Sequence, residues 1–234
     1  MTRRIVVLNP KGGSGKTTIA TNLAAFYATQ GLSSALMDWD PQASSTRWLK
    51  KRGPDQPPIH GIPAFERNLR VTRSFLLRAP VGCERLVADT PAAVPAQDIP
   101  PLIAHADAIL VPVLPSDIDI HACSKCISDL LLVAKVRRSE DKIGVVANRA
   151  RRNYRSFSML MRFLDTLNIP VVTTLRDSQN YLKVAESGVA LHEMRSHAVR
   201  EDTATWEPLL RWLDERPQPL VARTPMPEGL EAHG

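Results

Sequence analysis

The stretch LNPKGGSGKTT, residues 8–18, restricts the fold of this chain more than any other part of the sequence. It follows a β-branched apolar run at residues 4–9 and precedes residues 16–30, whose apolar residues have the period of a helix. A glycine-rich turn between a strand and a helix points successive backbone N–H groups into one concavity, next to the positive end of the helix. The stretch therefore predicts a P-loop that binds polyphosphate.

The side chains of this loop predict a nucleotide bound with magnesium. The Lys16 ammonium group is expected to reach the β- and γ-phosphates, the Thr17 hydroxyl to ligate Mg²⁺, and Thr18 to donate to the α-phosphate. The backbone cradle is formed by Gly12, Gly13, Ser14 and Gly15. The loop departs from the usual pattern G-x-x-x-x-G-K-[ST], because Pro10 replaces the first glycine and a second lysine, Lys11, follows it.

Apolar runs that alternate with amphipathic stretches predict a doubly wound α/β sheet, mostly parallel, with helices on both faces. The predicted strands are residues 4–9, 33–38, 85–89, 108–113, 142–148 and 169–174. The predicted helices are residues 16–30, 118–136, 156–167 and 203–215. Residues 51–63, with four prolines, predict a surface loop. We expect one domain over residues 1–215 and a flexible, proline-rich tail over residues 216–234.

The positive charge is concentrated in one segment. Residues 135–200 contain 13 Lys and Arg against 6 Asp and Glu, an excess of 7, whereas the rest of the chain has 17 against 18. Such asymmetry favours a polyanionic partner, with nucleic acid preferred to a membrane. Three cysteines are too few for a disulfide framework, and no apolar run is long enough for a signal sequence or a membrane span, so we expect a soluble intracellular protein.

Carboxylates follow two of the predicted strands. Asp38 and Asp40 are two residues apart at a strand end, so both side chains can address the phosphate site from the carboxyl edge of the sheet. Asp89 ends the apolar run RLVAD and is expected to hold Mg²⁺ through water.

Several motifs together carry a family resemblance that extends over residues 3–213. KGGSGKTT is similar to the deviant Walker A motif of the ParA/MinD family of ATPases, and DWDPQ and ADTP resemble two further motifs of that family. The resemblance implies that ATP is the nucleotide and that Lys11 crosses to the nucleotide of a second subunit when two ATP-loaded subunits dimerise. A single subunit is expected to leave Lys11 idle in solvent.

The same resemblance implies roles for other residues. Asp40 would orient the attacking water and Asp38 would lie beside the magnesium shell. Asn148, in the segment VVANR, would contact adenine, and Pro115 with Ser116 would approach the nucleotide or the dimer interface.

Within the family, the chain resembles the short ParA type, because we expect from the sequence neither an N-terminal DNA-binding domain nor a terminal amphipathic helix for membranes. This type binds double-stranded DNA without sequence preference, so it is associated with the nucleoid in the cytoplasm. A protein of the ParB or McdB type, carried by a plasmid, chromosome, chemoreceptor cluster or carboxysome, stimulates its slow ATP hydrolysis. The expected phosphate contacts are Arg176, Lys183, Arg195 and Arg200, followed by the cluster Arg151, Arg152 and Arg155.

Two other functions remain open at this point. Cys123 and Cys126 have the C-x-x-C spacing of metal ligands, which would suit an iron–sulfur or metal-handling ATPase of the same fold. We favour two buried helix residues instead, because a second pair of cysteines is missing. A P-loop kinase or a biotin-pathway synthetase that phosphorylates a small molecule is the third possibility.

Overall fold

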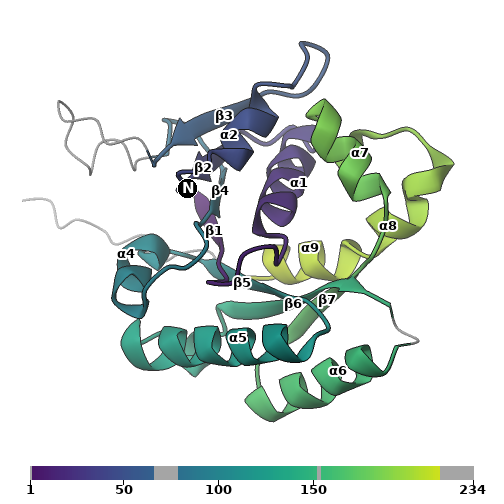
Figure 1. The fold of residues 1–234 in the computed structure, drawn as a ribbon. Helices are drawn as coiled ribbons and strands as arrows, with labels where there is room; N and C mark the ends of the chain where they lie inside the picture. Colours follow the sequence, from purple (N-terminus) through teal and green to yellow (C-terminus); the bar gives the residue numbers. More distant parts are fainter. Residues whose placement is uncertain (1, 66–78, 152–153, 217–234) are drawn as a thin grey trace, which may run out of the picture.

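The structure is a computed structural model that describes residues 2–65, 79–151 and 154–216. Seven strands form one sheet in the order β3-β2-β4-β1-β5-β6-β7, and all neighbouring strands are parallel (Figure 1). The strands are β1 (Arg3–Val7), β2 (Ser34–Asp38), β3 (Ile59–Pro63), β4 (Arg85–Asp89), β5 (Ala108–Val113), β6 (Ile143–Ala150) and β7 (Val171–Arg176). The predicted doubly wound α/β fold is therefore confirmed.

Helices cover both faces of the sheet, as Figure 1 shows. One face packs against α4 (Ile99–Ile103), α5 (Asp117–Ser128) and α6 (Arg155–Leu167), and a π-helical turn at Asp129–Val133 continues α5. The other face packs against α1 (Lys16–Thr29), α7 (Asn180–Ser187) and α9 (Glu207–Asp214). Two further short helices are α2 (Ser44–Leu49) and α8 (Arg200–Ala204).

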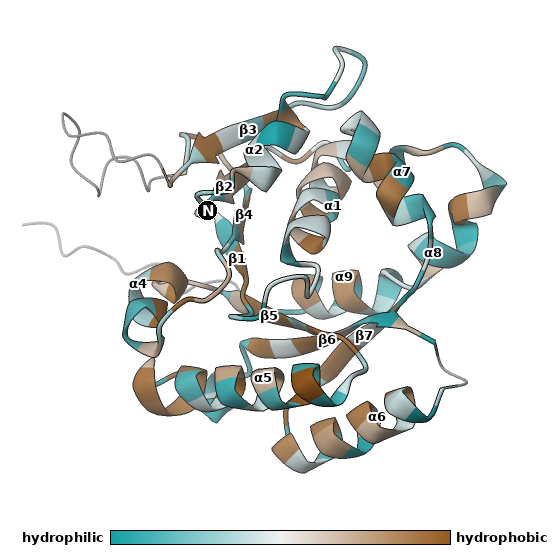
Figure 2. Ribbon diagram, in the orientation of Figure 1, coloured by the Kyte–Doolittle hydropathy of each residue, from teal (hydrophilic) through white to brown (hydrophobic). Residues whose placement is uncertain are grey.

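Two hydrophobic cores result from this arrangement, and each strand contributes to both. In β1, Val6 faces the core under α5 whereas Ile5 and Val7 face the core under α1, and all three are fully buried. Strands buried on both faces need unbroken apolar runs, which is why the sequence lacks strict alternation there. Figure 2 shows the same pattern, with hydrophobic residues along the central strands and polar residues on the outer faces of α5 and α6.

Several element predictions need correction. Residues 59–63 form the edge strand β3 inside the segment predicted as a loop; Pro63 is its last residue, a position at the sheet edge that tolerates proline. The predicted helix over 118–136 ends its α-helical part at Ser128, and the helix predicted over 203–215 is divided between α8 and α9. Helices α2, α4 and α7 were not predicted. Residues 217–234 of the predicted tail lie outside the described residues.

The strand order places the P-loop at a defined position. Strand β1 pairs with β4 on one side and with β5 on the other, so the strand order reverses direction beside it. In open α/β sheets, ligands bind at this point, outside the carboxyl ends of the strands. Within the described parts of the chain, no helix has the length and apolar content needed to cross a membrane.

Candidate active site

The loop between β1 and α1 has the backbone of a phosphate-binding turn. Gly13 and Gly15 adopt positive φ angles of 76° and 94°, which other residues rarely tolerate, and α1 begins at Lys16. The Lys16 ammonium group curls back over the loop and donates to the Lys11 carbonyl at 3.2 Å. Burial lowers the pKa of Lys16, and the nearby carboxylates of Asp89 and Asp40 oppose that effect. A buried cation beside the backbone N–H groups of a glycine-rich turn suits a polyanion.

This loop forms one wall of a cleft of about 480 Å³. The residues predicted to bind nucleotide that line it are Gly12, Gly13, Gly15, Lys16, Thr17, Thr18, Asp40 and Asn148. The opposite wall comes from the end of β6 and from the start of α7, where Arg149, Gln179 and Leu182 lie. Pro115 is not part of this lining.

Asn148 supports the loop directly. Its side-chain amide donates to the Ser14 carbonyl at 2.8 Å, and the residue is only 5% exposed. A Cβ atom on Gly15 would lie 2.1 Å from the Asn148 amide nitrogen, so position 15 needs glycine for its contact as well as for its φ angle. The predicted contact of Asn148 with adenine stays a prediction.

Asp89 lies at the end of β4, beside the start of α1. Its Oδ2 accepts hydrogen bonds from the Thr17 hydroxyl at 2.7 Å and from the Ser45 hydroxyl at 2.6 Å, whereas its buried Oδ1 has no partner among the described residues. Burial raises the pKa of Asp89 to about 6, against the effect of the two hydroxyl donors. A buried carboxylate oxygen without a partner, next to a threonine hydroxyl, fits the oxygen ligands that Mg²⁺ prefers.

Asp38 and Asp40 lie in different surroundings. Asp38 is 1% exposed and accepts three hydrogen bonds, from the backbone N–H and hydroxyl of Thr46 at 2.8 Å and from the Asp40 N–H at 3.0 Å. Burial raises the pKa of Asp38. Asp40 lines the cleft and accepts a hydrogen bond from the Gln42 N–H at 2.9 Å. Only the second carboxylate therefore lines the cleft, whereas the first contacts the start of α2.

Lys11 does not lie idle in solvent, which corrects the expectation for a single subunit. Its ammonium group forms an ion pair at 2.7 Å with Asp119 in the first turn of α5, and the two side chains are 30% and 3% exposed. Ser116 caps this helix and its hydroxyl donates to the same Asp119 oxygen. A buried carboxylate needs such partners. The charge of Lys11 is therefore balanced by a carboxylate of the same subunit.

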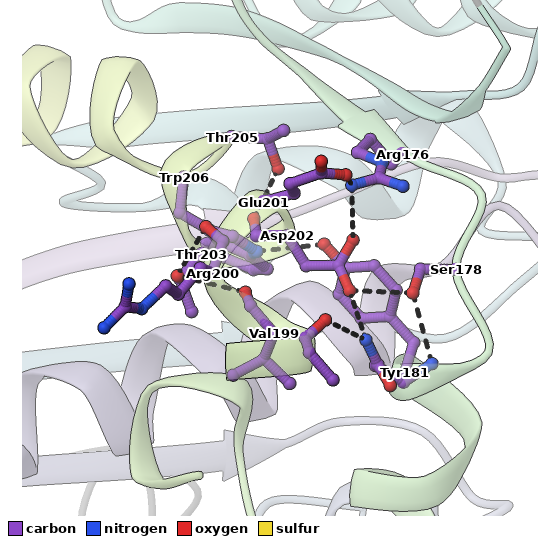
Figure 3. A network of polar contacts seen from close by, with 12 residues as sticks. Arg176, Ser178, Tyr181, Val199, Arg200, Glu201, Asp202, Thr203, Thr205 and Trp206 are labelled. Carbon is purple, nitrogen blue, oxygen red and sulfur yellow. Dashed lines mark hydrogen bonds and ion pairs between the residues drawn. The ribbon is translucent and has the colours of Figure 1, made fainter. Parts of the chain in front are cut away.

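The arginines and lysine predicted to bind DNA differ in their contacts. Arg151 pairs with Asp177 at 2.8 Å, and Arg176 pairs with Glu201 and lies 3.8 Å from Asp202. Figure 3 shows Arg176 in a polar network that joins the end of β7 to α8. The described residues give no ion pair to the exposed side chains of Arg155, Lys183, Arg195 and Arg200. Arg152 lies outside the described residues.

The two cysteines with metal-ligand spacing are core residues. Cys123 and Cys126 are fully buried on α5, and burial raises the pKa of the Cys123 thiol to about 12 and that of Cys126 further. Metal ligation requires the thiolate, which such surroundings oppose. Within residues 2–65, 79–151 and 154–216, no group of three or more His, Cys, Asp and Glu side chains is arranged to hold a metal ion.

Sequence reasoning missed three residues that contact the candidate site, namely Asp119, Ser45 and Thr46. Asp119 follows Ser116 by three residues, the spacing of a helix cap, and that local reading conceals its long-range pair with Lys11. Ser45 and Thr46 follow the segment DWDPQ closely, but no local signal shows which carboxylate each hydroxyl reaches.

Comparison with known proteins identifies similar chains. A family model for the CobQ/CobB/MinD/ParA nucleotide binding domain matches residues 5–191. The "Maintenance of carboxysome distribution protein A" of Halothiobacillus neapolitanus is 28% identical over 194 residues, which cover 81% of this chain and 87% of that protein.

Two solved structures share the fold. A plasmid partition protein of Borrelia burgdorferi bound to AMPPNP is similar with a TM-score of 0.67 and 16% identity, over 91% of this chain and 100% of that chain. Apo McdA from Cyanothece is similar with a TM-score of 0.67 and 16% identity, over 89% of this chain and 100% of that chain.

Proposed function

The chain belongs to the CobQ/CobB/MinD/ParA family of nucleotide-binding domains, and we propose that it is a ParA-type ATPase whose hydrolysis cycle positions a cargo on DNA. The observation that carries this proposal is one cleft in which Lys16, Thr17 and Asp40 meet beside Asp89, whose buried Oδ1 has no partner in the part of the chain that the structure describes. Nucleotide hydrolysis needs a cationic cradle for the phosphates, oxygen ligands for a metal and a carboxylate that can orient water, and all three are present.

Each side chain has a defined task in this proposal. Lys16 and the N–H groups of the loop bind the β- and γ-phosphates, and Thr17 with Asp89 holds Mg²⁺, which neutralises phosphate charge when bound. Asp40 orients the water that attacks the γ-phosphate. Asp38, saturated by Thr46 and the Asp40 N–H, fixes the loop that carries Asp40. Hydrolysis by the isolated protein is slow, because the water is positioned fully only when the partner protein is bound.

Dimerisation couples ATP to the rest of the cycle. Lys11 leaves Asp119 and contacts the nucleotide of a second subunit, so that a stable dimer forms only when ATP is present. The dimer binds double-stranded DNA through Arg155, Lys183, Arg195 and Arg200, whose exposed side chains are not engaged in ion pairs within the described structure. Two copies of each cation double the number of phosphate contacts, which strengthens binding to DNA.

The cargo is a protein body or a DNA molecule that carries the activating partner. The relative from Halothiobacillus neapolitanus is named for carboxysome distribution and aligns over most of this chain, which favours a carboxysome or a similar protein body. The structural relative from Borrelia burgdorferi is a plasmid partition protein, which makes a plasmid the second candidate.

The test is phosphate release from ATP by the purified protein with Mg²⁺, measured alone, with double-stranded DNA, and with both DNA and a candidate partner of the ParB or McdB type. We expect slow release that the combination accelerates and that K16A abolishes. Release that depends on a small-molecule acceptor instead, with formation of its phosphate ester, would show a kinase and overturn the proposal.

A further inference from the structure

Ser45 joins the first turn of α2 to the carboxylate of β4. Its side chain is completely buried, and its hydroxyl donates to Asp89 Oδ2 at 2.6 Å. The Thr17 hydroxyl donates to the same oxygen at 2.7 Å. Three separate elements, α1, α2 and β4, therefore meet at one carboxylate oxygen.

The neighbouring residue makes a second attachment of the same kind. Thr46 donates both its N–H and its hydroxyl to Asp38 Oδ2, each at 2.8 Å. The residue before α2, Ala43, has no side chain that can cap the helix, so the Asp38 carboxylate satisfies an N–H group of the first turn. Consecutive hydroxyls thus attach α2 to two adjacent strands, β4 and β2.

These attachments fix the short loop that carries Asp40. The Trp39 N–H donates to the Asp89 carbonyl at 2.9 Å, and the Ala43 N–H donates to the Asp40 carbonyl at 2.7 Å. Asp40 therefore lies between a strand end held by Asp89 and a helix start held by Ser45 and Thr46. Its position relative to the P-loop depends on both ends.

We propose that Ser45 is a positioning residue that orients Asp89 toward the magnesium of bound nucleotide. Both hydroxyl donors lie on Oδ2, and the described residues give the buried Oδ1 no partner. Thr17 can donate its hydrogen to Asp89 and still offer a lone pair to a metal, whereas Ser45 has only the orienting task. This inference rests on the proposed function, because it assigns Ser45 to the Mg²⁺–ATP of that site.

A purely structural role for Ser45 predicts a different outcome. Loss of a buried hydrogen bond lowers the melting temperature wherever it occurs, without regard to the metal. Loss of a residue that orients a metal-binding carboxylate weakens binding only when the metal is present, by about 10- to 100-fold. The dependence of nucleotide affinity on Mg²⁺ therefore separates the two roles.

Ser34→Ala is the matched control. Ser34 is 4% exposed, and its hydroxyl donates to the Ala24 carbonyl at 2.8 Å, so the same substitution removes a similar buried bond away from the cleft. The measurement is the Kd of a fluorescent ATP analogue for wild type, S45A and S34A, with Mg²⁺ and with EDTA. Thermal unfolding of the three proteins measures the structural cost of each change.

We expect S45A to bind the analogue in EDTA with the wild-type Kd. The gain in affinity on adding Mg²⁺, which is the ratio of Kd in EDTA to Kd with Mg²⁺, should be about tenfold smaller for S45A than for wild type. S34A should show the wild-type gain. A wild-type gain in S45A, or an equal loss with and without Mg²⁺, overturns the proposal. If S45A unfolds too readily for binding measurements, S45C decides, because its thiol fills the space of the hydroxyl but is only a weak donor: a reduced Mg²⁺ gain supports the proposal and a wild-type gain overturns it. Wild-type protein that binds no nucleotide refutes the proposed function instead.

Discussion

The ammonium group of Lys11 lies 2.7 Å from Oδ2 of Asp119, a carboxylate that is buried within the same subunit. The family resemblance assigns Lys11 to the nucleotide of a second subunit. Dimerisation would therefore have to replace the ion pair between Lys11 and Asp119. The contact also explains how the loop accommodates a second lysine beside Lys16, since the charge of Lys11 is balanced by Asp119. In the dimer proposed above, phosphate of the second subunit's nucleotide competes with this carboxylate for Lys11.

Replacing Asp119 with Asn should favour the dimer. Lys11 then loses its ionic partner, so no ion pair has to break before Lys11 can contact the phosphates of the second subunit's nucleotide. Because Lys11 is partly exposed, the gain is about 1 kcal/mol, or roughly fivefold in the protein concentration at which ATP produces half dimer. Analytical ultracentrifugation with Mg²⁺–ATP measures that concentration.

The control is Asp117→Asn in the same helical turn, since Asp117 is exposed and its carboxylate lies 3.9 Å from His121 rather than against Lys11. It should leave the midpoint unchanged. A midpoint for D119N that equals that of wild type, or that moves to higher concentration, would show that Asp119 does not compete for Lys11.

Removal of both Arg195 and Arg200 should weaken DNA binding and its salt dependence. Both are exposed, and each is expected to displace one counterion from DNA, so the slope of log K against log salt should fall by about 2 for each subunit. Fluorescence anisotropy of a labelled random duplex with Mg²⁺–ATP gives this slope. R151A, which removes an arginine already paired with Asp177, should reduce the slope less. Equal slopes for wild type and R195A/R200A would exclude these contacts.

Arg176 should matter for stability more than for DNA. Its guanidinium group pairs with Glu201 and lies 3.8 Å from Asp202, whose side chain is 2% exposed and also accepts hydrogen bonds from Ser178 and Asn180 (Figure 3). R176A removes a charge partner from a buried carboxylate and should cost about 1 to 2 kcal/mol of unfolding free energy. Urea unfolding measures it. R200A is the comparison and should cost nothing measurable; an R176A protein as stable as R200A would contradict the role of this network.

His192 should make the protein less stable as the pH falls. Its ring packs edge-on against Phe26 and Trp206, its Nδ1 is buried without a partner among the described residues, and burial lowers its pKa to about 4. Because the unfolded chain takes up the proton near pH 6.5 and the folded chain only near 4, stability is lost across that interval. Allowing for its partial exposure, we expect a loss of about 2 kcal/mol.

His192→Phe tests this dependence by keeping the aromatic contacts and removing the titrating group. Its unfolding free energy, measured in urea over the acid range, should fall less than that of wild type. His121→Gln, at a histidine that is 80% exposed, should leave the wild-type slope in place. A slope for H192F as steep as that of wild type would assign the acid sensitivity to other groups.

The sequence predicted the parts of this structure that local patterns determine. Unbroken apolar runs predicted six of the strands, and the glycines before Lys16 predicted the turn that joins β1 to α1. Strand β3 was missed because Gly61, Pro63 and the prolines that precede the strand resemble a loop, and only its pairing with β2 makes it a strand. The Lys11–Asp119 pair could not be predicted, because its partners meet only after β5 has packed beside β1.

ATP-dependent dimerisation of Lys11→Ala tests the central claim most directly, with Lys16→Ala as its counterpart. Wild type should become a dimer on addition of Mg²⁺–ATP, as measured by light scattering after size exclusion. K11A should bind the fluorescent ATP analogue with wild-type Kd and remain a monomer, whereas K16A should lose about 100-fold in nucleotide affinity, because it lacks the cation inside its own loop. A K11A protein that dimerises with ATP and hydrolyses it as wild type does would contradict the account.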